Sequence, residues 1–208
     1  MYILGFLTVF IIIFSVYRSF KYEQRKNFIE NFDYSTILKN KVINQYDKEN
    51  VVKGLKQFFL ICLENKMQIM SLSSKTVGLP SKLISSVLKD FMTSSKEYEL
   101  FCKKAFGKFL HYTDSENMNS EPIECEISES TFALVNTWNT ACQIEEVDHT
   151  KPKKIPLIFK IDREADIKNG LHYTLNYDYH QKDFCVNKIS LSMEDHVSRK
   201  YCSGFCSF

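Results

Sequence analysis

Residues 2–17 read YILGFLTVFIIIFSVY, an almost wholly apolar run without a charged side chain. At about 1.5 Å of helix per residue, extending this run to Phe20 roughly spans the hydrocarbon core of a bilayer, with Arg18 reaching outward to the headgroups. A cleavable signal peptide would instead need a basic segment before the run and a small-residue cleavage site after it, and a buried core helix is the remaining alternative. We therefore predict a transmembrane signal anchor over residues 1–20. Its anchoring side chains are Tyr2, Phe6, Phe10, Phe14, Tyr17 and Arg18.

The charges after this run predict its orientation. Residues 18–26 carry four basic side chains against the single acid Glu23, and no basic residue precedes the run. Because basic flanks stay on the cytoplasmic side, we expect an inner-membrane protein with its N-terminus outside and residues 18–208 in the cytoplasm. The same cluster can contact anionic headgroups, which reinforces the anchor. The whole chain has a net charge of only +2, so the remainder is close to neutral and no nucleic-acid partner is expected.

Seven cysteines are spread along the chain, an odd number that favours reduced thiols in the cytoplasm over a disulfide framework. Four soft ligands lie in the C-terminal part, namely Cys185, His196, Cys202 and Cys206. Structural zinc sites usually contain a tight pair such as Cys-x2-Cys, and the Cys-x3-Cys spacing of the last two cysteines is the nearest approach. We interpret these residues as free thiols and predict no cofactor, with a zinc site as the alternative.

Apolar residues recur with helical spacing through the first half of the soluble part. The predicted helices cover residues 51–63, 83–92, 98–110 and 129–144. Pro80-Ser81 starts the second, and Ser94 with Glu97 forms a capping box for the third. The third helix carries aromatic residues that we assign to the core rather than to a ligand site, namely Phe101, Phe106 and Phe109.

The C-terminal part has a different pattern. After a polar connection over residues 145–154, residues 155–159 (IPLIF) predict a short buried strand or turn, and Asn169-Gly170 is a hairpin signal between residues 165–168 and 171–175. We expect a mainly α fold, in which a transmembrane helix is followed by a helical bundle with a small C-terminal β-hairpin or irregular part. The predicted divisions are an anchor (1–20), a basic juxtamembrane connection and first helix (21–47), a helical core domain (48–144) and a C-terminal extension (145–208).

Several short motifs together resemble a known group of proteins. These are Leu79-Pro80-Ser81, Phe91, Tyr98, Phe101-Cys102, Ala105-Phe106-Gly107 and Phe109-Leu110-His111, continued by Trp138, Ala141-Cys142, Asp162, Gly170 and Tyr173. Over most of residues 1–175 the chain resembles a group of bacterial membrane-anchored proteins that are similar to the plant glycine-rich-domain family. The resemblance implies a bacterial protein and an architecture, but the group has no activity that could be carried over.

The chain departs from the motif of that group at two places. Where the motif has Trp-His-Glu, this chain has Leu88-Lys89-Asp90, and where it has His-His-Thr-Pro, the chain keeps His111 and then reads Tyr112-Thr113-Asp114. Asp90, Cys102 and His111 are the residue types of an orienting acid, a nucleophile and a base. However, Cys102 falls on an apolar helix face and His111 at a helix end, so we interpret both as structural.

The remaining motifs favour a protein without catalytic residues. No phosphate-binding loop, HExxH or GxSxG sequence occurs, and the acidic pairs Glu145-Glu146 and Glu194-Asp195 lie in polar stretches typical of solvated surface. We predict a membrane-tethered, non-enzymatic protein whose helical domain binds an unidentified protein partner at the cytoplasmic face. The alternatives are a hydrolytic or metal-dependent enzyme using His111 or the C-terminal cysteines, and an accessory subunit of a larger inner-membrane complex.

Overall fold

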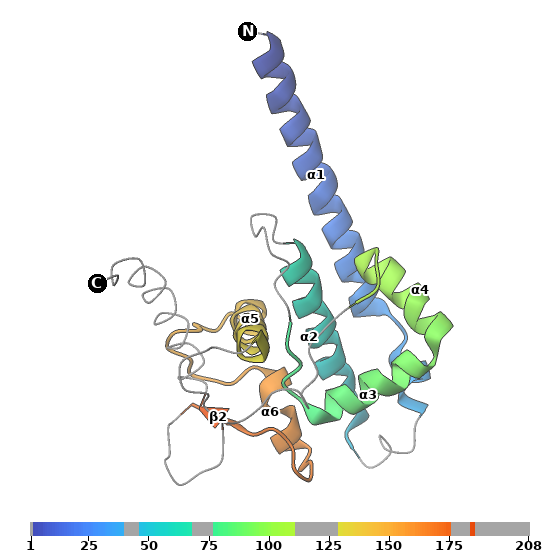
Figure 1. Ribbon diagram of the computed structural model, residues 1–208, viewed down its shortest axis with the longest axis vertical. Helices are drawn as coiled ribbons and strands as arrows, with labels where there is room; N and C mark the ends of the chain where they lie inside the picture. Colours follow the sequence, from blue (N-terminus) through green and yellow to red (C-terminus); the bar gives the residue numbers. More distant parts are fainter. Residues whose placement is uncertain (1, 40–45, 68–76, 111–128, 176–183, 186–208) are drawn as a thin grey trace, which may run out of the picture.

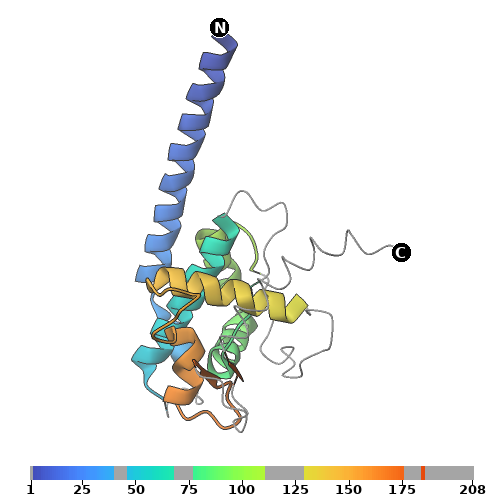
Figure 2. The same ribbon diagram turned by 90° about the vertical axis from the view of Figure 1, so that its left-hand side faces the viewer.

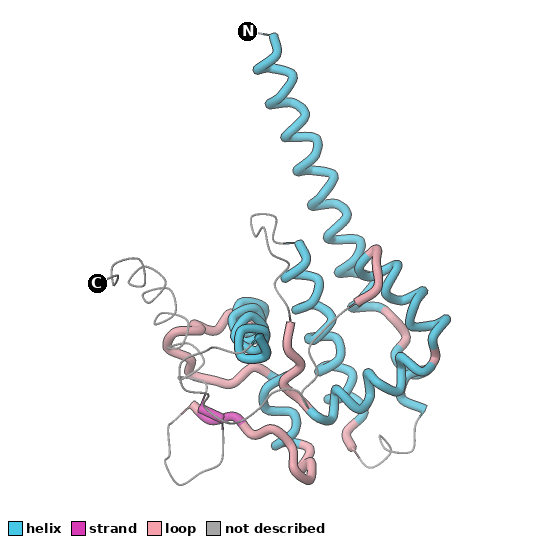
Figure 3. Tube along the Cα trace, in the orientation of Figure 1, coloured by secondary structure: helices cyan, strands magenta, loops and turns pink. Residues whose placement is uncertain are grey.

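The computed structural model describes residues 2–39, 46–67, 77–110, 129–175 and 184–185. The helices are α1 (Tyr2–Asn31), the 3-10 helix η1 (Tyr34–Lys39), α2 (Lys48–Met67), α3 (Lys82–Thr93), α4 (Ser95–Phe106), α5 (Glu129–Ile144) and α6 (Leu157–Glu164). Two short strands complete the described part, β1 (Tyr173–Thr174) and β2 (Phe184–Cys185). The predicted fold class is confirmed, because a long apolar N-terminal helix is followed by a packed helical bundle (Figure 1, Figure 3).

Helix α1 has two halves with different surroundings. Its N-terminal half projects beyond the rest of the molecule, and Phe6 and Phe10 are 76% and 66% exposed (Figure 1, Figure 2). Its C-terminal half packs against α2 and α4, where Ile29 is fully buried. The helix continues through Arg18 without a break. Its length and composition fit a membrane span or a signal sequence.

Helix α2 lies at the centre of the bundle and contacts α1 and each of α3 to α6. The predicted apolar face is confirmed, since Leu55, Phe58 and Phe59 are all fully buried. Gly54 allows the close approach of two neighbours. A Cβ atom at this glycine would lie 2.9 Å from Cδ1 of Ile84 on α3 and 2.8 Å from Cδ1 of Ile161 on α6.

Helices α3 and α4 follow each other almost directly. The predicted start of α3 is confirmed, because Ser81 Oγ accepts a hydrogen bond of 3.0 Å from the N–H of Ile84. The predicted capping box of α4 is wrong, because the Ser94 side chain caps no backbone N–H. Ser94 closes α3 instead, with its own N–H donating to the carbonyl of Phe91. Gly107 ends α4 in the left-handed conformation that favours glycine, with a φ of 72°.

Helix α5 has the predicted bounds and crosses the bundle (Figure 2). Its Trp138 side chain is fully buried. The Trp138 ring meets Phe159 of α6 edge-on, with 5.1 Å between ring centroids. The prediction of a strand or turn over residues 155–159 is wrong, because α6 begins at Leu157. The apolar residues of this segment are buried at helical spacing, with Ile158, Phe159 and Ile161 facing the core.

The C-terminal part is irregular in the residues that the structure describes. The predicted hairpin at Asn169-Gly170 is wrong, because residues 165–172 contain no strand and the Gly170 N–H closes only a local turn onto the carbonyl of Ile167. Strands β1 and β2 instead pair in parallel, with Tyr173 opposite Phe184. Phe109, predicted to lie in the core, is 46% exposed beyond the end of α4.

Candidate functional site

A groove of about 970 Å³ lies where the C-terminal half of α1 meets the ends of α2 and α4. The described residues that line it include six basic side chains and no acidic one. The complete lining among the described residues consists of Phe14, Tyr17, Arg18, Lys21, Gln24, Arg25, Phe28, Lys66, Lys103 and Lys104. The groove therefore combines an apolar wall with a concentrated positive charge.

Three helices bring these cations together. The residues from α1 recur every three or four positions from Phe14 to Phe28, so they occupy one face of that helix. Lys66 lies in the last turn of α2, and Lys103 and Lys104 lie in the last turn of α4. Lysines are favourable there because the last carbonyls of a helix carry a partial negative charge.

Aromatic rings support the lysines at the two ends of the groove. The Lys21 ammonium lies 5.8 Å from the centroid of the Tyr17 ring, and the Lys104 ammonium lies 5.7 Å from that of Phe28. Cation–π contacts of this length hold a lysine while leaving its charge available to an anion. Lys21 Nζ also donates to Gln24 Oε1, 3.3 Å away.

Arg25 lies directly against the end of α4. Its Nη2 atom is 2.6 Å from the place that a Cβ atom would occupy at Gly107. Gly107 thus satisfies two requirements: it adopts a positive φ, and it leaves room for the guanidinium. The end of α4 and the basic face of α1 are fitted to each other at this glycine.

Lys66 shows the electrostatic character of the groove most clearly. Partial burial, followed by the nearby charges of Lys108 and Arg25, lowers the pKa of Lys66 to about 8. Its ammonium donates a hydrogen bond to the carbonyl of Phe106 at the end of α4. Among the described residues, no carboxylate lies within ion-pair distance of the groove's six cations. An anion in the groove would favour the charged form of this lysine.

The most buried carboxylate of the described residues has a structural role. Asp162, 1% exposed, accepts hydrogen bonds from Ser81 Oγ at 2.6 Å and from the N–H groups of Lys82, Leu83 and Leu171 at 2.8, 3.2 and 2.9 Å. These contacts hold the first turn of α3 and the chain after α6 in place. Charge-assisted hydrogen bonds of this kind are strong, and all the oxygen atoms of Asp162 are engaged.

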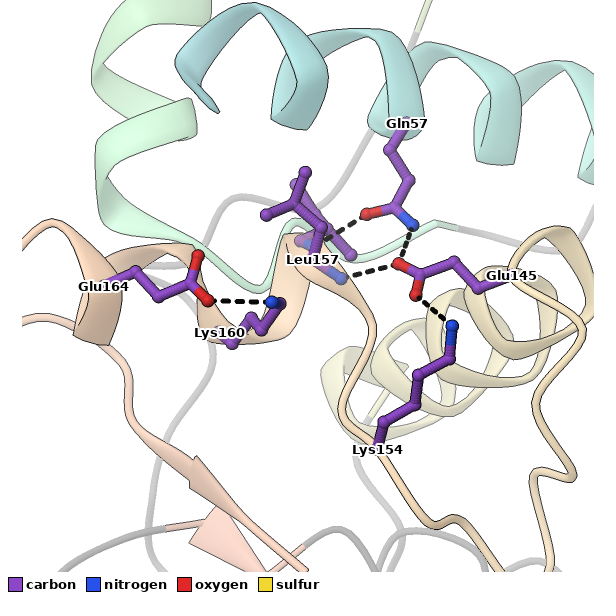
Figure 4. A network of polar contacts seen from close by, with 7 residues as sticks. Gln57, Glu145, Lys154, Leu157, Lys160 and Glu164 are labelled. Carbon is purple, nitrogen blue, oxygen red and sulfur yellow. Dashed lines mark hydrogen bonds and ion pairs between the residues drawn. The ribbon is translucent and has the colours of Figure 1, made fainter. Parts of the chain in front are cut away.

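A second polar network caps α6 (Figure 4). Pro156 precedes this helix and has no capping hydrogen bond, so the cap comes from elsewhere. Glu145 Oε1 accepts from the N–H of Leu157 and from Gln57 Nε2, both at 2.7 Å, and Gln57 Oε1 accepts from the N–H of Ile158 at 2.7 Å. The interpretation of Glu145 as solvated surface is therefore wrong, because the first turn of α6 requires an acceptor there.

The residues proposed from the sequence as a chemical site are not brought together in the described part. Cys102 is buried, and burial raises the pKa of its thiol, which favours the unreactive protonated form. His111, His196, Cys202 and Cys206 lie outside the described residues, as does the side chain of Cys185. The interpretation of the C-terminal cysteines as free thiols and the zinc alternative therefore both stay predictions. In the described ranges, no three metal-ligating side chains form a cluster.

Sequence reasoning found only half of the basic groove. Of the predicted anchoring residues, Phe14, Tyr17 and Arg18 line the groove, and Phe6 and Phe10 stay exposed. Tyr2 belongs to α1. The cations of α2 and α4 were missed, because nothing in their spacing indicates that the ends of these helices meet α1. A lysine in the last turn is so common that it gave no signal by itself.

A comparison with protein-family models matches residues 24–197 to the family described as UCP032817-like. No curated protein and no solved structure matches the chain significantly. The family model begins within the C-terminal half of α1 and includes the α2 and α4 parts of the groove. The similarity to glycine-rich-domain proteins stays a prediction.

Proposed function

The chain belongs to the UCP032817-like family, and from the structure of this member we propose that it is a single-span protein of the bacterial inner membrane. Its helical domain is held at the cytoplasmic face, where it binds another protein without catalysing a reaction itself. The observation that carries the proposal is the continuity of α1, which passes from an exposed apolar half directly into the packed core.

The exposed half of α1 supports a bilayer as its environment. Its large apolar side chains include Phe6, Phe10 and Phe14, which are 76%, 66% and 54% exposed. An apolar surface of this extent is unfavourable in water and favourable in hydrocarbon. The other half of the same helix is anchored by fully buried Ile29 and by the hydrogen bond from Tyr22 to Glu64 of α2. No flexible linker therefore separates the span from the domain.

The placement of positive charge supports the cytoplasmic orientation. Arg18, Lys21 and Arg25 follow the apolar half on α1, and the packing adds Lys66, Lys103 and Lys104 at the same level of the molecule. Basic residues close to the end of a span are retained on the cytoplasmic side. The fold thus strengthens the asymmetry that the sequence of α1 shows.

The buried polar groups support a non-enzymatic role because the fold already uses them. Asp162 holds the start of α3, while Gln57 and Glu145 cap α6. Asn65 of α2 donates to Thr140 of α5 at 2.9 Å, joining two helices. Each of these side chains has a structural partner, which accounts for its burial without a reaction.

Topology reporters test the location of the domain. We expect a green fluorescent protein fused to the C-terminus to fluoresce, and alkaline phosphatase at the same place to be inactive. The full chain should also resist extraction with alkaline carbonate and keep its original N-terminus. Active phosphatase would overturn the orientation, and a cleaved N-terminus would show that α1 is a signal peptide.

Cross-linking in cells tests the binding of a partner. A photoreactive residue is placed in turn at exposed positions across the domain, among them Leu100, which is 60% exposed on α4, and Lys151 in an exposed loop. We expect a discrete protein adduct of constant mass from at least one position. If exposed positions on every helix of the domain give only the uncoupled chain, the interaction role is wrong. Stoichiometric metal in the purified full chain would favour the enzymatic alternative.

A further inference from the structure

We propose that the groove between α1, α2 and α4 is a binding site for the phosphate-bearing headgroup of an anionic phospholipid. The lipid belongs to the same membrane that α1 crosses, so this inference rests on the proposed membrane location. It adds a specific ligand to that location, because a span alone requires no particular lipid. The anion is held by side chains from three helices rather than by the flank of one.

The position of the groove along α1 favours a lipid. Its lining runs from Phe14 and Tyr17, inside the apolar run, to Arg25 and Phe28, inside the packed half. At 1.5 Å per residue the lining residues of α1 extend over roughly 20 Å of helix, which covers the boundary between hydrocarbon and headgroups. A phospholipid has the same sequence of parts: an acyl chain beside Phe14 and a phosphate beside the basic residues below it.

The charges of the groove are complementary to such a ligand. Six cations converge, and no carboxylate among the described residues neutralises them within ion-pair distance. A phosphate accepts several charge-assisted hydrogen bonds at once, which suits the guanidinium of Arg25 beside the ammonium groups of Lys66 and Lys103. The volume of about 970 Å³ is sufficient for a headgroup together with the upper part of a chain.

The packing indicates that the groove is built into the fold. Arg25 is fitted against Gly107, and Lys66 reaches the carbonyl of Phe106 across the end of α4. Lys104 stands over the ring of Phe28. Solvated surface lysines would have no reason to converge on one another in this way, since like charges repel. A bound anion offsets that repulsion.

The test uses the full chain in lipid nanodiscs that contain equal amounts of phosphatidylglycerol and phosphatidylcholine. After gentle release, native mass spectrometry measures which lipid stays bound. The groove variant is Lys103→Gln/Lys104→Gln, because both side chains are exposed at the end of α4 and glutamine keeps most of their length without the charge. The matched control is Lys151→Gln/Lys153→Gln, which removes the same charge from an exposed loop outside the groove.

We expect one phosphatidylglycerol molecule to be retained by the wild-type chain and by the control. The groove variant should prefer this lipid about thirtyfold less, since each lysine near a membrane surface contributes roughly a factor of five. Equal retention of both lipids by the wild type, or an unchanged preference in the groove variant, overturns the lipid site.

Two further experiments distinguish a failure of the lipid site from a failure of the proposed membrane span. All variants should float with vesicles of pure phosphatidylcholine, because α1 inserts without anionic lipid, and failure of the wild type to float would overturn the membrane span itself. Inorganic phosphate is then titrated into the detergent-solubilised chain. If the groove binds phosphate while nanodiscs show no preference for phosphatidylglycerol, its ligand is a soluble phosphate compound and the lipid assignment is wrong.

Discussion

The two halves of α1 are one continuous helix placed in two different environments. In the N-terminal half, Phe10 is 66% exposed, and in the C-terminal half Ile29 is fully buried against the bundle. Helical backbone hydrogen bonds are satisfied within the helix in both halves, so only the side chains distinguish them. The comparison teaches that one unbroken helix joins the exposed apolar segment to the core, and that the basic groove lies at the boundary between its two halves.

The strongest contrast between the halves should appear in the stability of the domain. We expect Ile29→Ala to lower the free energy of unfolding by about 2–5 kcal/mol, because it leaves a cavity between α1 and the core. The matched change Phe10→Ala should alter it by less than about 0.5 kcal/mol, since this side chain has no neighbours in the domain. Denaturant unfolding in a mild detergent measures both. Equal losses would show that the halves are not energetically distinct.

Membrane insertion should show the opposite dependence. Phe10→Lys places a charge near the centre of the apolar run, at a cost of about 2.5–3.5 kcal/mol for insertion. We expect the carbonate-resistant fraction to fall sharply, while the unfolding midpoint of the domain stays the same. Phe10→Leu is the control and should insert normally. Normal insertion of the lysine variant would argue against α1 as a span.

A smaller effect is expected from Lys66 at the boundary. Its pKa is about 8 in the fold, against 10.5 for a free lysine, because of burial and the charges of Lys108 and Arg25, with Cys102 acting in the opposite direction. Between these values the unfolded chain binds more protons than the folded one, so stability rises with pH in this window. Thermal unfolding at about pH 7.5 and 9.5 measures this rise, and Lys66→Gln should reduce it.

Buried tyrosines set the highest pH at which the effect of Lys66 can be measured separately. Burial raises the pKa of Tyr34 and Tyr173 above the value of a free tyrosine, so their contribution to stability is lost as the pH rises through and beyond 10. The comparison of Lys66 variants therefore stays below this range. An identical pH dependence in the wild type and in Lys66→Gln would show that the lysine is not perturbed.

The smallest effect is expected when the apolar residues of the span are exchanged for other apolar residues. Replacing residues 2–13 by leucine keeps a helix that can cross the bilayer and leaves Phe14 and Tyr17 of the groove in place. We expect location and domain stability to be unchanged within error. If instead a co-purifying membrane protein is lost, the span is a contact surface, and the accessory-subunit alternative gains support.

Local signals predicted the elements whose stability is local. The helical spacing around Leu55 and Phe58 and the cap at Ser81 were sufficient to place α2 and the start of α3, and α5 has its predicted bounds. The apolar run of α1 was equally clear. In each case the residues that determine the element lie within it or directly before it.

Two of the errors occurred where distant residues determine the structure. The segment containing Ile158 becomes helical because Gln57 and Glu145 supply its cap, across 101 and 12 residues of sequence respectively. The turn at Gly170 is fixed by Asp162, whose carboxylate also receives the N–H of Leu171. The spacing of apolar residues in the sequence does not indicate such long-range contacts. The same reason explains why the α1 cations of the groove were found and those of α2 and α4 were not.

The continuity of α1 is the claim on which the membrane location, the orientation and the groove all depend. Hydrogen–deuterium exchange of the full chain in nanodiscs tests it directly at residues 18–27, between the span and the core. We expect these backbone amides to exchange slowly, at rates similar to those of the buried segment around Ile29. Exchange within seconds, as in a free linker, would mean that residues 18–27 form a flexible connection and that no fixed groove exists at the membrane surface.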